Sequence, residues 1–296
     1  MAKVNIHIFG STTTSGLALK ELFKNSFKNY NLIFHSRRSK DQFVIDLNDI
    51  SNIDKIFLEN ENIIISLAPI WLFSKFLKAL ESKNKKIINN ISQIIAVSSS
   101  SLITKKYAFS DYDKSLVKRL EKAELELLKL HGRNKFTIDI IRPTMIYGNI
   151  KDTKDKNINV ILSILRKMPF ILLPTNTGER QPIHAKQLAY LIFYRLNLFV
   201  NRKINKHSHN LINVGGDVTI NYYSMIKNLQ KSLPKKDIGR FCLIIQVPKN
   251  IFFFCLSFLL IIKPKLYESI LRISTNLSGF QEVHKLTLSE KSDFPI

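Results

Sequence analysis

Hydrophobic positions in the first half of the chain form short apolar runs that alternate with amphipathic segments of helix length. A run such as residues 63–65, three consecutive isoleucines, is typical of a strand covered on both faces. The pattern predicts strands at residues 4–9, 31–35, 43–46, 63–67, 93–98 and 137–142, and helices at residues 16–25, 71–83 and 115–131. This alternation predicts an α/β fold with a doubly wound parallel sheet.

The second half of the chain has a looser pattern. A lysine-rich loop at residues 151–157 precedes a predicted helix at 158–168, and a strand at 209–214 leads to a helix from Thr219. The sequence contains no internal repeat or low-complexity linker. We therefore expect the second half to supply a small C-terminal substrate cap on the first.

Composition narrows the function classes. The 296 residues carry a net charge of +22, but the lysines are scattered and no recognition module accompanies them, so we expect no nucleic-acid partner. Small anionic ligands suit this charge. Cys242 and Cys255 are the two cysteines, and His207 and His209 have no nearby cysteine or carboxylate, so we expect no metal site. The N-terminus runs directly into a strand without a signal-peptide pattern, so we expect a cytoplasmic protein.

A glycine-containing loop joins the first predicted strand to the first helix. It reads Gly10, Ser11, Thr12, Thr13, Thr14, Ser15 and Gly16. This is the place where a Rossmann-type fold binds a dinucleotide pyrophosphate, and glycine there permits a tight turn and close approach of the backbone. Thr13 replaces the usual middle glycine, so its Cβ faces the pyrophosphate position while the loop hydroxyls offer donors.

The end of the second strand indicates which dinucleotide binds. No Asp or Glu lies between Glu21 and Asp41, so the acid that normally holds a ribose 2′-hydroxyl is missing. Arg37 and Arg38 stand there instead, and two guanidinium groups suit a 2′-phosphate. The sequence therefore favours NADP, with NAD as the alternative.

Six further segments, in order, resemble the extended short-chain dehydrogenase/reductase superfamily, especially its NAD(P)-dependent nucleotide-sugar epimerases and dehydratases. The resemblance covers roughly residues 3–227. It assigns Asp46, Leu47, Leu67 and Ala68 to the cofactor site, and Ser100 of the AVSSSS segment to the position of the active-site serine. It assigns Arg142, Tyr147, Arg180 and His184 to the substrate side. NVGG at residues 213–216 matches a late strand of the family. For His184, capping of the next helix is an equal alternative to binding a substrate phosphate.

The chain departs from this family at the catalytic pair. The resemblance places the family's tyrosine at Leu116 and its lysine, four residues later, at Leu120. Neither leucine can transfer a proton. Tyr112 lies one turn before Leu116 and is the substitute we consider, with Lys105 and Lys114 as further candidates.

The sequence therefore predicts an NADP-dependent epimerase, reductase or dehydratase acting on a nucleotide-linked sugar. The alternative is a catalytically inactive NADPH-binding sensor or assembly subunit. We expect residues 1–240 to form the NAD(P)-binding domain with interleaved cap segments, and residues 241–296 an apolar helix and tail.

Residues 251–262 are twelve consecutive residues, mostly apolar, with lysines on both sides. The segment is too short to cross a bilayer, which takes about 20 residues. We expect a buried helix or one that faces a partner in a homodimer. Weak contact with a membrane surface, which would make the protein membrane-peripheral, is the alternative.

Overall fold

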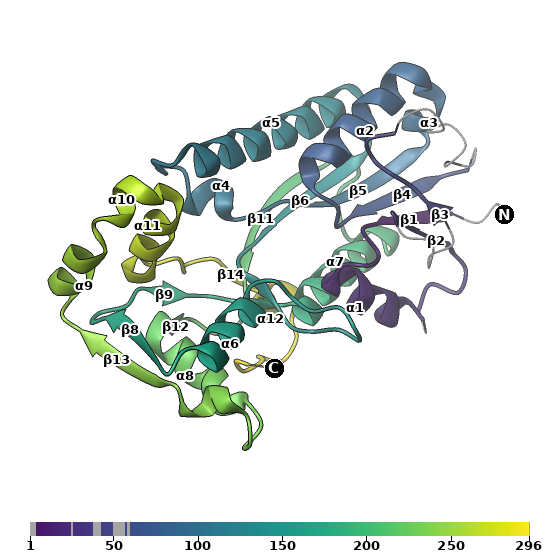
Figure 1. Cartoon of the computed structure of the whole chain (residues 1–296). Helices are drawn as coiled ribbons and strands as arrows, with labels where there is room; N and C mark the ends of the chain where they lie inside the picture. The colour runs from purple at the N-terminus through teal and green to yellow at the C-terminus, as the bar shows by residue number, and fades with distance from the viewer. Residues whose placement is uncertain (1–3, 25, 38–42, 50–56, 58–59, 296) are drawn as a thin grey trace.

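One eight-stranded parallel sheet organises the protein, as the computed structural model shows for residues 4–24, 26–37, 43–49, 57 and 60–295 (Figure 1). The strand order is β14-β11-β6-β5-β4-β1-β2-β3. The strands are β1 (Asn5–Phe9), β2 (Asn31–Ser36), β3 (Phe43–Val44), β4 (Asn62–Ser66), β5 (Ile91–Val97), β6 (Thr137–Pro143), β11 (His209–Gly215) and β14 (Gln281–Glu282). The order reverses between β1 and β4, and open α/β sheets bind ligands at such a switch point. The predicted doubly wound Rossmann-type fold is confirmed.

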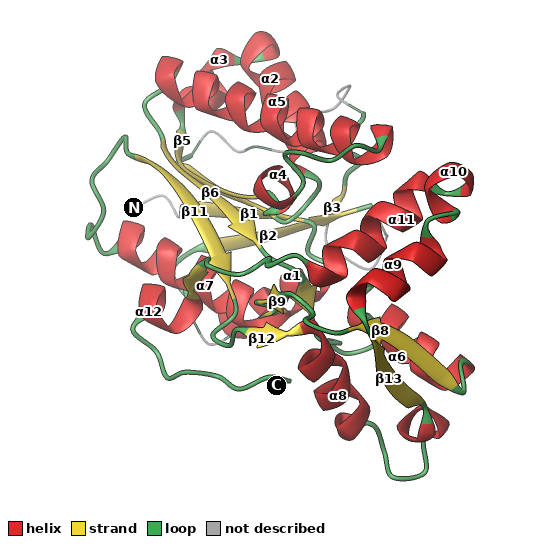
Figure 2. Cartoon of the chain, turned by 90° about the vertical axis from the view of Figure 1, so that its left-hand side faces the viewer, coloured by secondary structure: helices red, strands yellow, loops and turns green. Residues whose placement is uncertain are grey.

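Helices cover both faces of this sheet (Figure 2). One face carries α2 (Ile70–Lys83), α3 (Lys85–Asn89) and α5 (Asp111–Arg133), and the other α1 (Thr14–Phe23), α7 (Ala185–Val200) and α12 (Val283–Thr287). Each layer has its own core. Phe73 and Phe76 of α2 pack with Leu127 of α5 on the first face, and Leu19 of α1 packs with Leu188 of α7 on the second. Burial on both faces explains why the strands are almost uniformly apolar.

The cap consists of two helices and three short strand pairs, followed by a group of short helices. The helices are α6 (Ile158–Lys167) and α8 (Tyr222–Ser232); the strand pairs are β7 (Ile146–Tyr147) with β10 (Ile183–His184), β9 (Glu179–Arg180) with β12 (Ile220–Asn221), and β8 (Phe170–Pro174) with β13 (Leu243–Val247). The short helices are α9 (Lys249–Leu256), α10 (Leu259–Ile262) and α11 (Pro264–Leu271), and they lie near α4 (Ser101–Thr104) (Figure 1). The second half is not only a cap, because α7, β11, β14 and α12 complete the main sheet and its layers.

Two helix starts differ from the sequence prediction for a local reason. The helix expected from residue 115 already begins at Asp111, because Ser110 caps it by accepting a hydrogen bond from the Asp113 N–H at 3.4 Å. The helix expected from Thr219 begins at Tyr222, where Asn221 accepts from the Ser224 N–H at 2.7 Å. Capping side chains therefore set both boundaries.

The apolar segment 251–262 also differs from expectation. It forms two short helices, α9 and α10, rather than one, and Phe252 is its buried residue. Ile251, Phe254 and Ile261 are exposed. The expectation that this segment is buried within the chain is therefore wrong.

A polar network lies inside the sheet at the switch point. His7 Nε2 lies 3.1 Å from Asn62 Oδ1, and His7 Nδ1 lies 2.9 Å from His35 Nε2. Because an amide oxygen only accepts, His7 donates from Nε2, and a neutral His7 then accepts at Nδ1 from His35. Burial lowers the pKa of His7 to about 4 and that of His35 to about 3, so both rings are neutral at pH 7.

Candidate dinucleotide and substrate site

The loop between β1 and α1 has the close approaches that the glycines predicted. Gly10 has a φ of +75°, and a Cβ there would lie 2.8 Å from the Leu67 carbonyl carbon and 2.9 Å from the Ala68 nitrogen. A Cβ on Gly16 would lie 2.5 Å from the Gly10 carbonyl oxygen. Both distances are shorter than real Cβ contacts, so this backbone requires glycine at both positions.

Thr13 closes the loop through its own side chain. Its hydroxyl donates to the Gly10 carbonyl at 2.9 Å and accepts from the Gly16 N–H at 3.1 Å, which makes Thr13 the N-cap of α1. The hydroxyl is thus used within the loop. Thr14 and Ser15 occupy the first helical turn, where backbone N–H groups have no partner within the helix. The buried hydroxyl of Ser15 has no hydrogen-bond partner among the described residues.

Arg37 follows β2 and is exposed at the same carboxyl edge of the sheet. Arg38 lies outside the described residues. Asp46 is exposed and accepts hydrogen bonds from the backbone and side chain of Asn48, both at 2.9 Å, whereas Leu47 is buried in the core beneath α2. Ser11 reaches across to β2 and donates to the His35 carbonyl at 3.1 Å.

Ser100 lies just beyond β5 on the same edge. It is buried, and its N–H donates to the Pro143 carbonyl at the end of β6, at 2.9 Å. Beside it, Arg142 holds the carboxylate of Glu124 from α5, with Nε 3.0 Å from Oε2. Ser98 donates to the other oxygen of Glu124 at 2.5 Å, and Arg142 also approaches Asn213 Oδ1 at 3.4 Å. The Glu124–Arg142 pair was not predicted from the sequence.

The two leucines that the sequence resemblance aligns with the family's tyrosine and lysine lie in the core or pack against it. Leu120 is buried among Phe73, Leu77 and Leu127, and Leu116 packs against the same cluster. Neither side chain carries an ionisable group. The departure inferred from the sequence therefore agrees with their packing.

Tyr112 lies on α5, because the helix begins at Asp111. Its side chain is about half exposed, and the ammonium group of Lys265 from α11 lies 3.3 Å from the centroid of its ring. The C-terminal helices therefore reach the start of α5, as Figure 1 shows. Sequence reasoning missed this contact because the two residues are far apart in the chain.

The same junction contains a buried carboxylate, Asp113. It lies 2.7 Å from Lys105 Nζ and 2.9 Å from an Arg272 terminal nitrogen. Burial opposes ionisation of Asp113, but the hydrogen bond and charge of Lys105, with those of Arg272, lower its pKa below the ordinary value. Lys105 thus has a structural partner, while Lys114 lies exposed, 4.0 Å from Asp111.

Arg180 is buried where the cap meets the C-terminal segment. It donates to the carbonyls of Glu179 and Thr275, both at 2.7 Å, and to the carbonyl of Arg272. Burial lowers its pKa to about 10, so it stays protonated at pH 7. Arg180 therefore holds these segments together, and its contact with a substrate phosphate stays a prediction, as does that of Arg142.

His184 takes the capping role that the sequence left open. Its Nδ1 accepts from the Lys186 N–H at 3.2 Å, and Gln187 completes a capping box at the start of α7. The imidazole packs against the buried ring of Tyr147, and a Cβ at Gly148 would lie 2.1 Å from its Nε2. Burial lowers the pKa of His184 to about 4, so the ring is neutral at pH 7.

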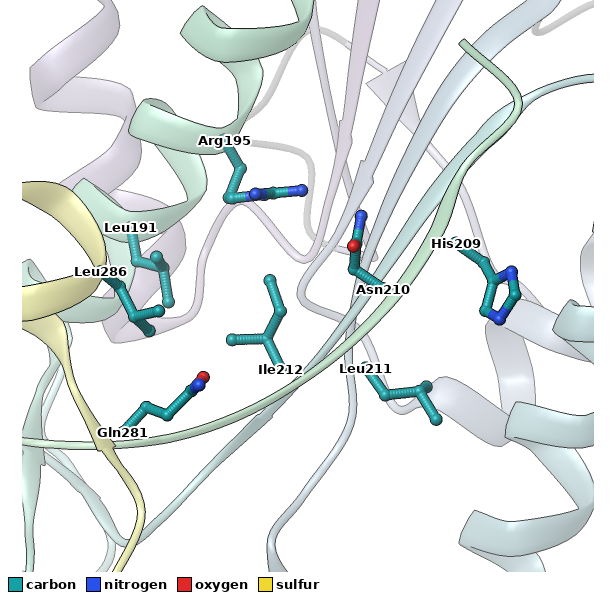
Figure 3. A pocket seen from close by; sticks show the side chains of 8 residues that line it. All are labelled: Leu191, Arg195, His209, Asn210, Leu211, Ile212, Gln281 and Leu286. Atoms are coloured by element: carbon teal, nitrogen blue, oxygen red, sulfur yellow. The ribbon is translucent and has the colours of Figure 1, made fainter. Parts of the chain in front are cut away.

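Two cavities lie away from this edge. One, of about 440 Å³, lies at the outer side of β11 between Leu191, Arg195, Ile212 and Leu286 (Figure 3). The other, of about 380 Å³, is lined by Ser92 and Thr137 near the starts of β5 and β6, at the opposite end of the strands from Ser100. Within the described part of the chain, no group of three or more His, Cys, Asp or Glu side chains is arranged to hold a metal ion.

The fold of this chain is similar to that of known structures. Solved structures of nucleotide-sugar epimerases and dehydratases share it, which confirms the Rossmann-type fold predicted from the sequence. The UDP-glucuronic acid 4-epimerase of Bacillus cereus, in complex with UDP-glucuronic acid and NAD, matches with a TM-score of 0.65 and 14% identity, over 98% of this chain and 94% of that chain. RMD from Pseudomonas aeruginosa, complexed with NADPH, gives a TM-score of 0.61 and 11% identity, over 97% of this chain and 94% of that chain.

A third similar structure is the dTDP-glucose 4,6-dehydratase of Bacillus anthracis in complex with NAD. Its TM-score is 0.57 at 13% identity, over 82% of this chain and 85% of that chain. No protein-family model matches the chain. No curated protein matches it in sequence. At these identities the comparison establishes the fold.

Proposed function

We propose that this protein binds a nicotinamide dinucleotide at the carboxyl edge of its sheet and acts as an NAD(P)-dependent epimerase, reductase or dehydratase on a nucleotide-linked sugar. The β1–α1 loop carries the proposal. Gly10 and Gly16 leave no room for a Cβ there, and the N–H groups of Thr14 and Ser15 lie at a helix N-terminus, where a pyrophosphate is stabilised. The loop therefore fits the phosphates of a dinucleotide.

We further propose that NADP is preferred over NAD. Arg37 is exposed at the end of β2, the position that faces the adenosine ribose in this fold. A guanidinium group there binds a 2′-phosphate through paired, charge-assisted hydrogen bonds. The similar structures contain either NAD or NADPH, so the preference rests on this residue and on Arg38.

The chain's own residues would orient the sugar and move its proton. When bound, a nicotinamide cofactor exchanges a hydride with a sugar carbon. Ser100, at the end of β5, would donate a hydrogen bond to the reacting oxygen. Tyr112 is the proposed proton carrier, with its ring held by Lys265. A nucleotide-linked sugar is the proposed substrate because proteins of the same fold bind UDP-glucuronic acid and UDP-glucose. The substrate would enter between this edge and the cap.

A second candidate function is a catalytically inactive protein that binds NADPH as a sensor or assembly subunit. The packing of Leu120 in the core, with the partly buried Leu116 against it, favours this function, because the sequence resemblance aligns these leucines with the family's lysine and proton carrier. Both candidates require the same dinucleotide site.

One experiment separates them. The purified protein is titrated with NADPH and NADH. The 4-keto forms of UDP-glucose, UDP-glucuronic acid and dTDP-glucose, which can accept a deuteride, are then incubated with NADPH deuterated at C4, and the three parent sugars are incubated with NADP⁺, which can accept their hydride. Transfer of deuterium to a sugar, detected by mass spectrometry, is the result expected of an enzyme. Tight NADPH binding without transfer or sugar isomerisation would support the inactive protein. Failure to bind either dinucleotide would overturn both candidates.

A further inference from the structure

One end of the molecule has a continuous series of exposed apolar side chains. It comprises the outer face of the β8–β13 strand pair and the outer face of the α9–α10 segment, and is called the apolar end below. These elements lie along the left margin of Figure 1, and Figure 2 looks onto that side. α9 also contacts β8 directly.

The strand pair presents one fully apolar face. In the parallel register, Leu243 pairs with Phe170 and Ile245 with Leu172. These four side chains are 43–65% exposed, while Ile171, Leu173 and Ile244 point inward and pack with the cap. The strands thus alternate between a buried apolar face and an exposed apolar face, whereas a soluble sheet usually presents polar residues outward.

The helical segment continues this surface. Ile251, Phe254 and Phe258 recur at positions i, i+3 and i+7, and Ser257 and Phe258 keep helical dihedrals between α9 and α10. Phe254 is 80% exposed and Ile261 is 87% exposed. Large apolar side chains this exposed, grouped rather than single, mark an interaction surface.

Basic residues surround the apolar end. Residues 160–174 and 235–267 together contain eight Lys and Arg (Arg166, Lys167, Lys235, Lys236, Arg240, Lys249, Lys263, Lys265) and one Asp or Glu, Asp237. Asp237 is itself held by Arg166 at 2.8 Å. The rim is therefore strongly positive.

We propose that the apolar end docks on an anionic lipid bilayer and lies in its interface. The combination of Phe, Ile and Leu with a lysine rim matches the chemistry of interfacial segments, which insert apolar side chains while lysines meet lipid phosphates. A second copy of the chain fits less well. A symmetric dimer through this surface would place two positive rims against each other. The proposal does not depend on the dinucleotide site.

The docking is peripheral. Within the described residues, no helix is both long and apolar enough to cross a bilayer, and α9 has eight residues. The helices are short enough to lie along the surface with their exposed face toward the acyl chains. Membrane contact then adds apolar burial to electrostatic attraction.

The full-length protein is tested by flotation with phosphatidylcholine vesicles, with and without 30% phosphatidylserine. We expect binding to the anionic vesicles that is weakened by high salt and released by carbonate at alkaline pH. Phe254→Ser combined with Ile261→Ser should weaken binding at least about tenfold, because two large apolar side chains no longer leave water. Leu125→Ser combined with Leu211→Ser is the matched control, since these exposed leucines lie on α5 and β11 and should leave binding unchanged.

A native cysteine reports the contact directly. Cys255 is exposed on α9, one residue after Phe254, and Cys242 is buried. An environment-sensitive dye on Cys255 should shift its emission to shorter wavelength on anionic vesicles. Equal binding by wild type and the Phe254/Ile261 variant would overturn the proposal. The proposal would also be overturned if the wild type formed a dimer without lipid, did not bind vesicles, and lost the dimer in the Phe254/Ile261 variant. Binding that resists carbonate would mean that the segment inserts into the bilayer, which would overturn peripheral docking.

Discussion

Arg142, at the end of β6, grips Glu124 from the middle of α5, with its Nε 3.1 Å from Oε1 and 3.0 Å from Oε2. Both side chains are largely buried. The pair fastens α5 to the sheet edge that also carries Ser100, so it fixes the distance between the predicted serine and the helix of Tyr112. We therefore expect a substitution here to change the position of Ser100 relative to α5 as well as the stability.

Glu124→Ala should lower the free energy of unfolding by about 3 kcal/mol, because it leaves the Arg142 charge buried without a partner. Urea denaturation followed by circular dichroism measures this. The exposed Glu121→Ala on the same helix is the control and should cost less than about 0.5 kcal/mol. Glu124→Leu combined with Arg142→Met should recover much of the loss. Equal effects of the Glu124 and Glu121 variants would contradict a stabilising role for the pair.

Arg37→Ala should weaken NADPH binding about tenfold or more and leave NADH binding nearly unchanged, because the lost hydrogen bonds go to the 2′-phosphate. Titration by intrinsic fluorescence measures both affinities. Arg37→Lys keeps the charge but lacks the planar guanidinium group, so its NADPH affinity should lie between those of the wild type and the Arg37→Ala variant. Wild-type affinities that are equal for NADPH and NADH would sink the proposed phosphate contact.

Ser100→Ala should lower turnover on a nucleotide sugar by roughly 10- to 1000-fold while leaving cofactor affinity unchanged, because the lost hydrogen bond forms with the developing oxyanion. Tyr112→Phe keeps the ring beside Lys265 and removes the hydroxyl. If Tyr112 carries the proton, turnover falls by about 100- to 10,000-fold. A Tyr112→Phe variant with normal turnover would move the role to another group, with Lys105 and Lys114 next.

Stability should fall between pH 6.5 and pH 4 because of the two buried histidines in the sheet, and the buried His184, whose pKa is about 4, adds to the same fall. Their folded-state pKa values, about 4 for His7 and about 3 for His35, lie below the ordinary 6.5, so the unfolded chain binds more protons in this range. Each histidine should cost roughly 2 kcal/mol by pH 5 relative to pH 8. His35→Gln should reduce the slope of unfolding free energy against pH. An unchanged slope would mean that His35 is protonated in the folded protein.

Local rules were enough to predict the β1–α1 loop and seven of the eight strands of the main sheet, the exception being the two-residue strand β14. Apolar runs identify strands buried on both faces. Gly16 is required by the Gly10 carbonyl within the same loop, whereas Gly10 is required by the backbone of Leu67 and Ala68, which follow β4. The absence of the catalytic pair was also predictable, because the side chains of Leu116 and Leu120 cannot transfer a proton wherever they lie in the fold. Side-chain identity and the positions of the glycines are local properties, whereas the contact of Gly10 with the backbone after β4 forms only in the folded sheet.

The cap and the C-terminal segment were not predictable in the same way. The sequence predicted that residues 251–262 form a helix that is buried or faces a partner, with membrane-surface contact as the alternative, because a run of Phe, Ile and Leu has the composition of a core. In the described part of the chain, no element covers that run, and most of its side chains are exposed. Exposure depends on which surfaces meet across the whole chain, and composition alone does not record it.

The sequence by itself thus determined the doubly wound core, the glycine loop and the absence of the usual tyrosine and lysine. The tertiary structure decided which partners the charged side chains found: Glu124 for Arg142, Lys265 for Tyr112, and Asp113 between Lys105 and Arg272. It also decided that His184 caps a helix and is neutral. These outcomes depend on contacts between residues far apart in the chain. Such contacts form only when the sheet has brought the carboxyl ends of its strands together.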